Sequence, residues 1–167
     1  MTNAARSHRG GAACCLLALT ALLSSCSGTL PVPLYGLNRQ LEAAGGQRNP
    51  SLGERWLALI QQRGGREQVV LVDLQRQMPV PVPGLNRPDA LPISVSVDAR
   101  GERIALVRQL DGHSEVVLYR RPLQSLQRLP MDDGAIPTAV TLRADGHQAA
   151  VQVSRDGQWQ IDLIDLP

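Results

Sequence analysis

Apolar and polar residues form short, recurring patterns along most of the chain. Residues 93–98 ("ISVSVD") alternate between apolar and polar, residues 103–108 ("RIALVR") form a short apolar run, and residues 115–120 ("EVVLYR") follow after a glycine-containing turn. Alternation is typical of a strand with one buried face, and a short apolar run is typical of an inner strand covered on both faces. Residues 78–84 ("MPVPVPG") and 127–130 ("QRLP") predict edge strands, because proline has no amide N–H to donate. These patterns predict a four-stranded antiparallel sheet with the prolines outermost.

The whole pattern recurs along the sequence. Residues 90–122 align without a gap to residues 135–167, 45 positions later, and 10 of 33 positions are identical. Residues 57–72 align to residues 104–119, 47 positions later, with seven of 16 identical. A period of this length is typical of propeller blades and related arrays, in which one small sheet cannot bury its apolar face alone. We therefore predict an all-β fold of about three four-stranded antiparallel propeller-type blades.

The strand types differ between the two ends of the repeated region. Residues 30–39 repeat residues 78–87 with seven of ten positions identical, which predicts an additional outer strand over Leu30–Tyr35. The last predicted strand, Gln160–Asp165, corresponds to the third strand of a blade. The N-terminal region thus has one extra outer strand, and the last blade lacks one outer strand.

A helix is expected over residues 37–46 ("LNRQLEAAGG"), where two glycines would end it. Known closed propellers have about four to eight blades, so three are too few for a ring. Two arrangements stay open. In one, two chains form a homodimeric six-bladed ring and exchange the Leu30 strand; in the other, an open array is capped by the Leu37 segment or by loops.

The N-terminal region predicts a signal peptide over residues 1–25. Basic residues within the first nine positions precede a short apolar run at 12–23, which is the order found in secretory signals. The run is shorter than the roughly 20 apolar residues that cross a bilayer, although an uncleaved anchor stays an alternative. It ends in "LSSC" (23–26), which resembles the lipobox of bacterial lipoproteins, whose cysteine receives a diacylglyceryl group.

Cys26 is therefore the predicted lipidation site and the first residue of a domain over residues 26–167; the alternative is an unmodified thiol. Several acyl chains on one cysteine hold a protein on a membrane without spanning it. Cys14 and Cys15 would leave with the signal, so neither a disulfide nor a cysteine-based metal site is expected within one mature chain. By resemblance to bacterial lipoproteins, those retained in the inner membrane tend to carry aspartate after the cysteine. This chain has Ser27 there, which favours the outer membrane.

Charge argues against one class of partner. The chain contains no lysine, and removal of Arg6 and Arg9 with the signal would leave 15 arginines against 15 acidic residues. Nucleic-acid binding needs clustered basic residues that displace counterions from phosphates, and no arginine-rich run follows the signal. We therefore expect no nucleic-acid partner, and no motif indicates a cofactor.

The repeats resemble those of TolB-type periplasmic propellers. Residues 98–106 ("DARGERIAL") and 143–151 ("RADGHQAAV") correspond to the first part of that family's repeat, and residues 111–119 ("DGHSEVVLY") correspond to the second part. The repeats depart from the family at Ala99 and Ala144, where it has proline, and the separate N-terminal domain of TolB has no counterpart. The resemblance implies a periplasmic propeller-repeat domain and leaves the partner-binding role of TolB undecided.

The residues "DGHSE" (111–115) combine an acid, a histidine and a serine, and they raise the question of a hydrolytic site. In the other repeats only the turn residues recur, as Gly64–Gly65 and Asp156–Gly157. Asp and Gly favour tight hairpin turns, and neighbouring residues on a strand point to opposite faces. We interpret His113 as an exposed turn residue, and His147, which follows Gly146, in the same way.

Two further pairs of residues are candidates for chemistry. Asp132 and Asp133 suit a solvated turn better than a calcium site, because the full spaced set of oxygen ligands is absent. Trp56 and Trp159 are expected to serve packing rather than ligand stacking. No catalytic, cofactor-binding or metal-binding residue is therefore assigned, and Cys26 is the one predicted modification site.

The sequence favours a non-enzymatic, lipid-anchored binding or scaffold protein of the bacterial cell envelope, whose partner is an envelope protein or polymer. This rests on the predicted address and on analogy of fold. One alternative is an envelope hydrolase with its site in the mouth of the array, using His113 or His147 with Asp111 or Asp145. A degenerate lipoprotein with a structural role is the other alternative.

Overall fold

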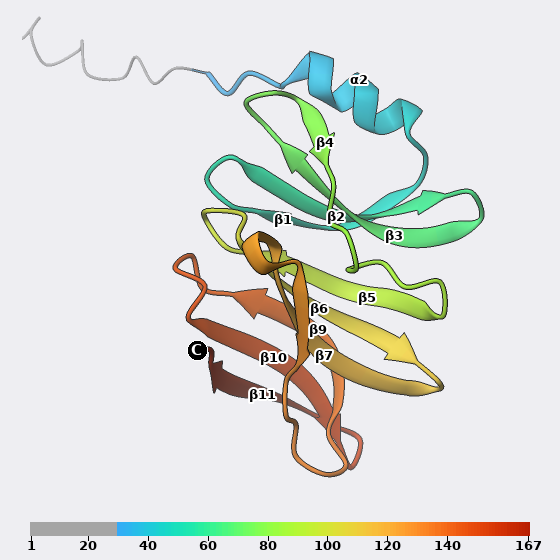
Figure 1. The fold of residues 1–167 in the computed structure, drawn as a ribbon, viewed down its shortest axis with the longest axis vertical. Coiled ribbons are helices and arrows are strands. Elements are labelled where there is room, and N and C mark those ends of the chain that lie inside the picture. The colour runs from blue at the N-terminus through green and yellow to red at the C-terminus, as the bar shows by residue number, and fades with distance from the viewer. Residues whose placement is uncertain (1–29) are drawn as a thin grey trace, which may run out of the picture. The chain divides into compact units, whose positions relative to one another are not determined.

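Three antiparallel sheets follow one another along the chain in the computed structural model, which describes residues 30–167 (Figure 1). Residues Tyr35–Pro167 make up one structural unit. Blade 1 contains β1 (Gln47–Leu52), β2 (Trp56–Arg63), β3 (Arg66–Asp73) and β4 (Met78–Val80); blade 2 contains β5 (Ala90–Val97), β6 (Arg103–Leu110), β7 (His113–Arg120) and β8 (Ser125–Arg128); blade 3 contains β9 (Ile136–Leu142), β10 (Gln148–Arg155) and β11 (Gln158–Asp165). The predicted all-β fold is confirmed, and blade 3 has three strands within the described residues, as the strand count predicts.

The predicted signal peptide, residues 1–25, and the predicted lipidation site, Cys26, lie outside the described residues. Within residues 30–167, no helix is long and apolar enough to cross a membrane.

The hairpin turns between the second and third strands share one backbone conformation. Asp111 and Gly112 have φ of 50° and 78°, and Asp156 and Gly157 have φ of 50° and 77°. Two successive residues with positive φ are what a two-residue hairpin of type I′ needs, and Asp and Gly tolerate this conformation best. The predicted turn is confirmed at Asp111 and Gly112, whereas His113, which is exposed as predicted, is already the first residue of β7.

Two apolar cores separate the three blades. Core 1 lies between blades 1 and 2 and includes Ile104 and Leu106 of β6, whereas core 2 lies between blades 2 and 3 and includes Ala105 and Val107 of the same strand. Alternate side chains of β6 thus enter different cores, because successive residues of a strand point to opposite faces. This explains the continuous apolar run that predicts an inner strand.

A third core covers the face of blade 1 that is turned away from blade 2. Helix α2 (Tyr35–Ala43) places Leu37 against Leu57, Leu59 and Val72 of β2 and β3. The predicted helix at 37–46 is therefore confirmed, although α2 begins two residues earlier and ends three residues earlier, at Ala43. A closed ring would need this face of blade 1 to pack against another blade, whereas α2 occupies it, as the open-array alternative predicts.

Within the single chain, the outer strand predicted over Leu30–Tyr35 is not formed. Residues 30–34 have no regular secondary structure, and Tyr35 is already the first residue of α2. The repeated sequence at 30–39 does not predict the local structure here, because its second half contains Leu37, which is buried against blade 1.

Strand β1 is absent from the predicted elements and turns out to connect the blades. Its sequence "QRNPSL" shows no alternation, and it contains a proline and a bulge. The side-chain oxygens of Asn49 and Ser51 accept hydrogen bonds from the backbone N–H groups of Val95 and Val97, at 3.0 Å each. Each inner strand is thus held to the next one by side-chain oxygens.

The same bridges recur one blade later. The hydroxyls of Ser94 and Ser96 accept from the N–H groups of Val140 and Leu142, at 3.2 and 2.8 Å. Because buried backbone N–H groups need partners, these polar positions on the inner strands fix how consecutive blades are aligned.

Candidate functional site

The two histidines that the hydrolase alternative offers, one or the other, lie at opposite ends of the array. His113 opens β7 and pairs with Leu110 at the end of β6. His147 belongs to the β9–β10 turn, whose Gly146 carbonyl accepts a hydrogen bond from Arg103 at the start of β6, at 2.8 Å. The eight residues of β6 span about 24 Å at the usual rise per residue. A site that uses both histidines is therefore excluded.

The acids beside these histidines have local roles. The Asp145 carboxylate accepts from the backbone N–H of His147 at 2.9 Å, and this bond holds the pKa of Asp145 below its usual value. Asp111 is a turn residue with positive φ. Asp132 pairs with Arg155 at 3.1 Å, and no group of three or more potential metal ligands occurs within residues 30–167.

The two tryptophans have different environments. Trp56 is 7% exposed in core 1, with the guanidinium groups of Arg55 and Arg121 at 5.0 and 4.6 Å from its ring. The prediction that Trp56 serves packing is confirmed. Trp159 on β11 is 66% exposed, so the same prediction is wrong there. Its neighbours on that face, Ile161 and Leu163, are also exposed.

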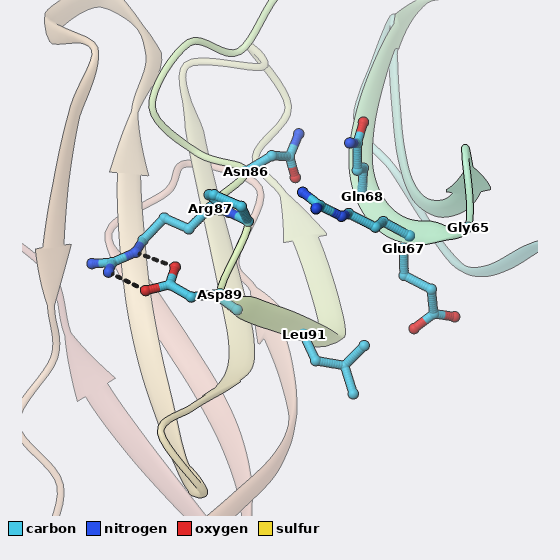
Figure 2. Close-up of a pocket in the computed structure, with 10 residues that line it drawn as sticks. Gly65, Glu67, Gln68, Asn86, Arg87, Asp89 and Leu91 are labelled. Carbon is cyan, nitrogen blue, oxygen red and sulfur yellow. Dashed lines mark hydrogen bonds and ion pairs between the residues drawn. The ribbon is translucent and has the colours of Figure 1, made fainter.

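A cleft opens between blades 1 and 2 at the end of the array that carries the β2–β3 and β6–β7 turns. This cleft 1 has a volume of about 590 Å³, and its lining comes from the start of β3 and from the connection between β4 and β5: Gly65, Arg66, Glu67, Gln68, Asn86, Arg87, Pro88, Asp89, Ala90 and Leu91. Figure 2 shows the Arg87–Asp89 pair on one side of the cleft and Glu67 and Gln68 of β3 on the other. Leu91 adds an exposed apolar side chain.

The wall formed by the connection is held by one asparagine. Asn86 accepts from the backbone N–H of Val69 at 2.8 Å and donates to the carbonyl of Val69 at 2.9 Å. Its amide therefore pairs with β3 as another backbone strand would. Leu85, the residue before it, is buried in core 1, so the repeated "GLNR" sequence anchors the connection at two neighbouring positions.

The two acidic groups of cleft 1 are paired. Arg87 donates from Nε and Nη2 to the two carboxylate oxygens of Asp89, at 2.9 and 2.6 Å, and these bonds lower the pKa of Asp89. Arg48 on β1 donates in the same bidentate manner to Glu67, at 2.8 and 2.7 Å, and lowers the pKa of that carboxyl group. Both acids are therefore ionised at neutral pH, and the cleft combines these charges with an apolar part of its lining.

An equivalent cleft opens between blades 2 and 3. Cleft 2 has a volume of about 420 Å³ and is lined from the start of β7 and from the connection between β8 and β9: Ser114, Glu115, Arg128, Leu129, Pro130, Met131, Asp132, Asp133, Gly134 and Ala135. Its lining elements occupy the same positions in the repeat as those of cleft 1. The repeat therefore produces an open cleft at both junctions, on the same end of the array.

A buried ion pair lies between the two clefts. Arg108 on β6 is 4% exposed and donates from Nε to Glu115 on β7, at 2.8 Å. Glu115 lines cleft 2, and Arg108 lines a small cavity that shares Glu67, Asn86 and Arg87 with cleft 1. Sequence analysis missed this pair, whose signal is an acid and a base at facing positions of two apolar strands.

Comparison with known proteins identifies the fold. No family model and no curated protein sequence matches the chain. Among solved structures, the chain is similar to TolB from Acinetobacter baumannii (TM-score 0.55, 18% identity, covering 70% of this chain and 29% of that protein). It is also similar to a protein assigned as TolB from Agrobacterium tumefaciens (TM-score 0.59, 9% identity, covering 72% of this chain and 46% of that protein). A puromycin hydrolase is similar as well (TM-score 0.51, 12% identity, covering 71% of this chain and 19% of that protein). The chain spans less than half the length of each, and at these identities the likeness shows an all-β, TolB-like array of propeller blades.

Proposed function

We propose that this chain is a non-enzymatic binding protein of the bacterial cell envelope, anchored through Cys26 and facing the periplasm, that binds an envelope protein or polymer through clefts 1 and 2. The recurrence of the cleft at both junctions carries the proposal. Two open grooves of the same construction, on the same end of the array, suit an extended partner that crosses both. A compact small molecule would need a single enclosed pocket.

The composition of the clefts favours a polypeptide partner. Cleft 1 offers paired charges of both signs together with Leu91, and cleft 2 offers Met131 beside acidic residues. Protein partners bring hydrogen-bonding groups and apolar side chains in the same mixture. The likeness to TolB supports a binding role by analogy of fold alone.

The proposed address rests on the first 27 residues. A short apolar segment that ends in "LSSC" supports lipidation of Cys26, and Ser27 supports the outer membrane. Mass spectrometry of the N-terminal peptide from the envelope protein tests this. We expect the first residue to be Cys26 carrying acyl chains, and we expect Cys26→Ala to abolish both processing and acylation. An unmodified thiol at Cys26 would refute the anchor.

Photo-cross-linking in cells tests the binding surface. The full chain would carry p-benzoylphenylalanine in place of Leu91, which lines cleft 1 and is 48% exposed. The matched control carries it in place of Leu123, which is 69% exposed in the 3-10 turn that follows β7, at the opposite end of blade 2. We expect a discrete cross-linked product from position 91 that position 123 does not give. The same products from both positions, or none from either, would contradict the proposal.

The hydrolase alternative has its own test. Substitution of both His113 and His147 by alanine should leave the folded state and any cross-linked product unchanged. Loss of an envelope hydrolytic activity in that variant, with the fold intact, would replace the binding function by an enzymatic one.

A further inference from the structure

The outer edge of β11 is unpaired among the described residues. In blade 1, β4 covers the corresponding edge of β3, and in blade 2, β8 covers that of β7. The face of β11 turned away from core 2 carries Trp159, Ile161 and Leu163, all exposed. An unpaired, apolar edge strand is a template for pairing with another chain. Blade 3 is therefore prepared to accept a fourth strand.

A segment with the sequence of such a strand is present in the chain. Residues 30–34 ("LPVPL") correspond to residues 78–82 ("MPVPV"), which contain β4. In blade 1, Val80 pairs with Leu71, and both Val80 and Val82 pack against core 1. The segment 30–34 therefore has the apolar and proline positions of an outer strand but belongs to no sheet.

The repeat defines how this segment would pair. Leu71 of β3 corresponds to Leu118 of β7 and to Leu163 of β11, because the offsets are 47 and 45 residues. The register of β4 on β3 then places Val32 opposite Leu163 and Leu30 opposite Asp165. In this register Val32 lies beside Leu163 on the exposed face.

The segment cannot reach that edge within its own chain. It is joined to Tyr35, the first residue of α2, and α2 packs on the face of blade 1 turned away from blade 2. Two sheet spacings of roughly 10 Å each separate blade 1 from blade 3, and the helix lies beyond blade 1. Five extended residues span at most about 18 Å. A strand on β11 must come from another molecule.

We infer that residues 30–34 of a second copy of this chain pair with the outer edge of β11, and that reciprocal exchange of this strand makes a two-fold dimer. The main-chain hydrogen bonds of an added strand supply affinity, and Val32 beside Leu163 supplies specificity. The exchange does not need a closed ring, since α2 stays on blade 1. The inference is independent of the proposed binding function, because it uses the edge of β11 and neither cleft.

Photo-cross-linking of the purified full chain tests the exchange. With p-benzoylphenylalanine in place of Leu163, we expect a covalent dimer whose cross-linked peptide contains residues 30–34. Val32→Asp should lower the yield of that dimer more than tenfold, because a carboxylate would face the apolar side of β11. Leu123→Asp, a matched change of an exposed leucine outside the contact, should leave the yield unchanged.

Three results would overturn the inference. One is a monomer without cross-links at micromolar concentration. Another is a cross-link to a segment other than 30–34, either within one chain or in a second copy. The last is a product in cells in which position 163 is joined to a different protein, because a different partner would then occupy the edge of β11.

Discussion

Substitution of Gly101 by alanine tests how tightly blades 1 and 2 are joined. Gly101 lies between β5 and β6 with φ of +65°, and a Cβ atom added there would lie 2.5 to 2.6 Å from three atoms of the Trp56 ring. The ring has little room to move, because Trp56 is buried and Arg121, beside the ring, also donates from Nε to the Gly101 carbonyl at 2.6 Å. The substitution should therefore be strongly destabilising.

The chain offers a control that separates strain from collision. Gly112 has a similar φ of +78°, but nothing lies within 4 Å of a Cβ added there. Both alanine variants lose about 1–2 kcal/mol for a left-handed backbone, and overpacking against Trp56 adds about 1–3 kcal/mol at Gly101 alone. We expect losses in the free energy of unfolding of about 1–2 kcal/mol for Gly112→Ala and about 2–5 kcal/mol for Gly101→Ala.

Urea unfolding followed by circular dichroism measures both losses, with the slope of the transition as a check that the unfolded state is unchanged. A third variant, Trp56→Leu, removes the ring that a Cβ would meet. Combined with Gly101→Ala, it should show a coupling energy of at least about 1 kcal/mol. Equal losses for the two glycine variants, or strictly additive losses in the double variant, would refute the close packing at this junction.

Three more predictions concern the ion pairs and the helix. Arg108→Ala removes the buried partner of Glu115 and should lower the free energy of unfolding by about 3–5 kcal/mol. Arg87→Ala, in the exposed wall of cleft 1, should lower it by about 0–1 kcal/mol. Similar losses for the two variants in urea unfolding would contradict this. Burial raises the pKa of Asp73, but hydrogen bonds from an arginine and two backbone N–H groups outweigh burial and leave it lowered. A carboxyl group of this kind stabilises the fold above its unfolded pKa of about 4 and loses that effect as the pH falls through its folded pKa, so Asp73→Asn should flatten the acid limb of a stability–pH curve, and an unchanged limb would contradict the assignment. Leu37→Ala should lower the free energy of unfolding by about 2–5 kcal/mol, because it leaves a cavity in the third core, between α2 and blade 1. Leu123→Ala, at an exposed site, should change it by no more than about 0.5 kcal/mol. Thermal unfolding of both variants checks the difference.

The strands and turns are readable from the chain because they depend on local rules. The apolar run of β6, the prolines at the edge and the Asp-Gly turns each follow from side-chain periodicity or backbone preference. The strand predicted over Leu30–Tyr35 is not formed within the single chain, because Tyr35 already begins α2, whose Leu37 is buried against blade 1. Strand β1 was missed, because Asn49 and Ser51 act through hydrogen bonds to another blade and leave no periodic signal.

The candidate site was less accessible to sequence reasoning. The interpretation of Asp111–Gly112 as a hairpin turn could be argued from the repeat, because only the turn residues recur. The clefts could not be predicted from the sequence, because the lining of each cleft combines the beginning of one strand with a connection about 20 residues away. Trp159 was assigned to packing on the general behaviour of tryptophan, and only the exposed face of β11 shows otherwise.

The sequence by itself determined the class of fold, the number of blades, the hairpin turns and the segment that resembles a spare outer strand, because periodicity and turn chemistry act over a few residues. The tertiary structure decided where α2 packs, which faces are covered, how side-chain oxygens align the inner strands and where the clefts open. Those features depend on contacts between residues that lie tens of positions apart, and such contacts form only when the blades stack.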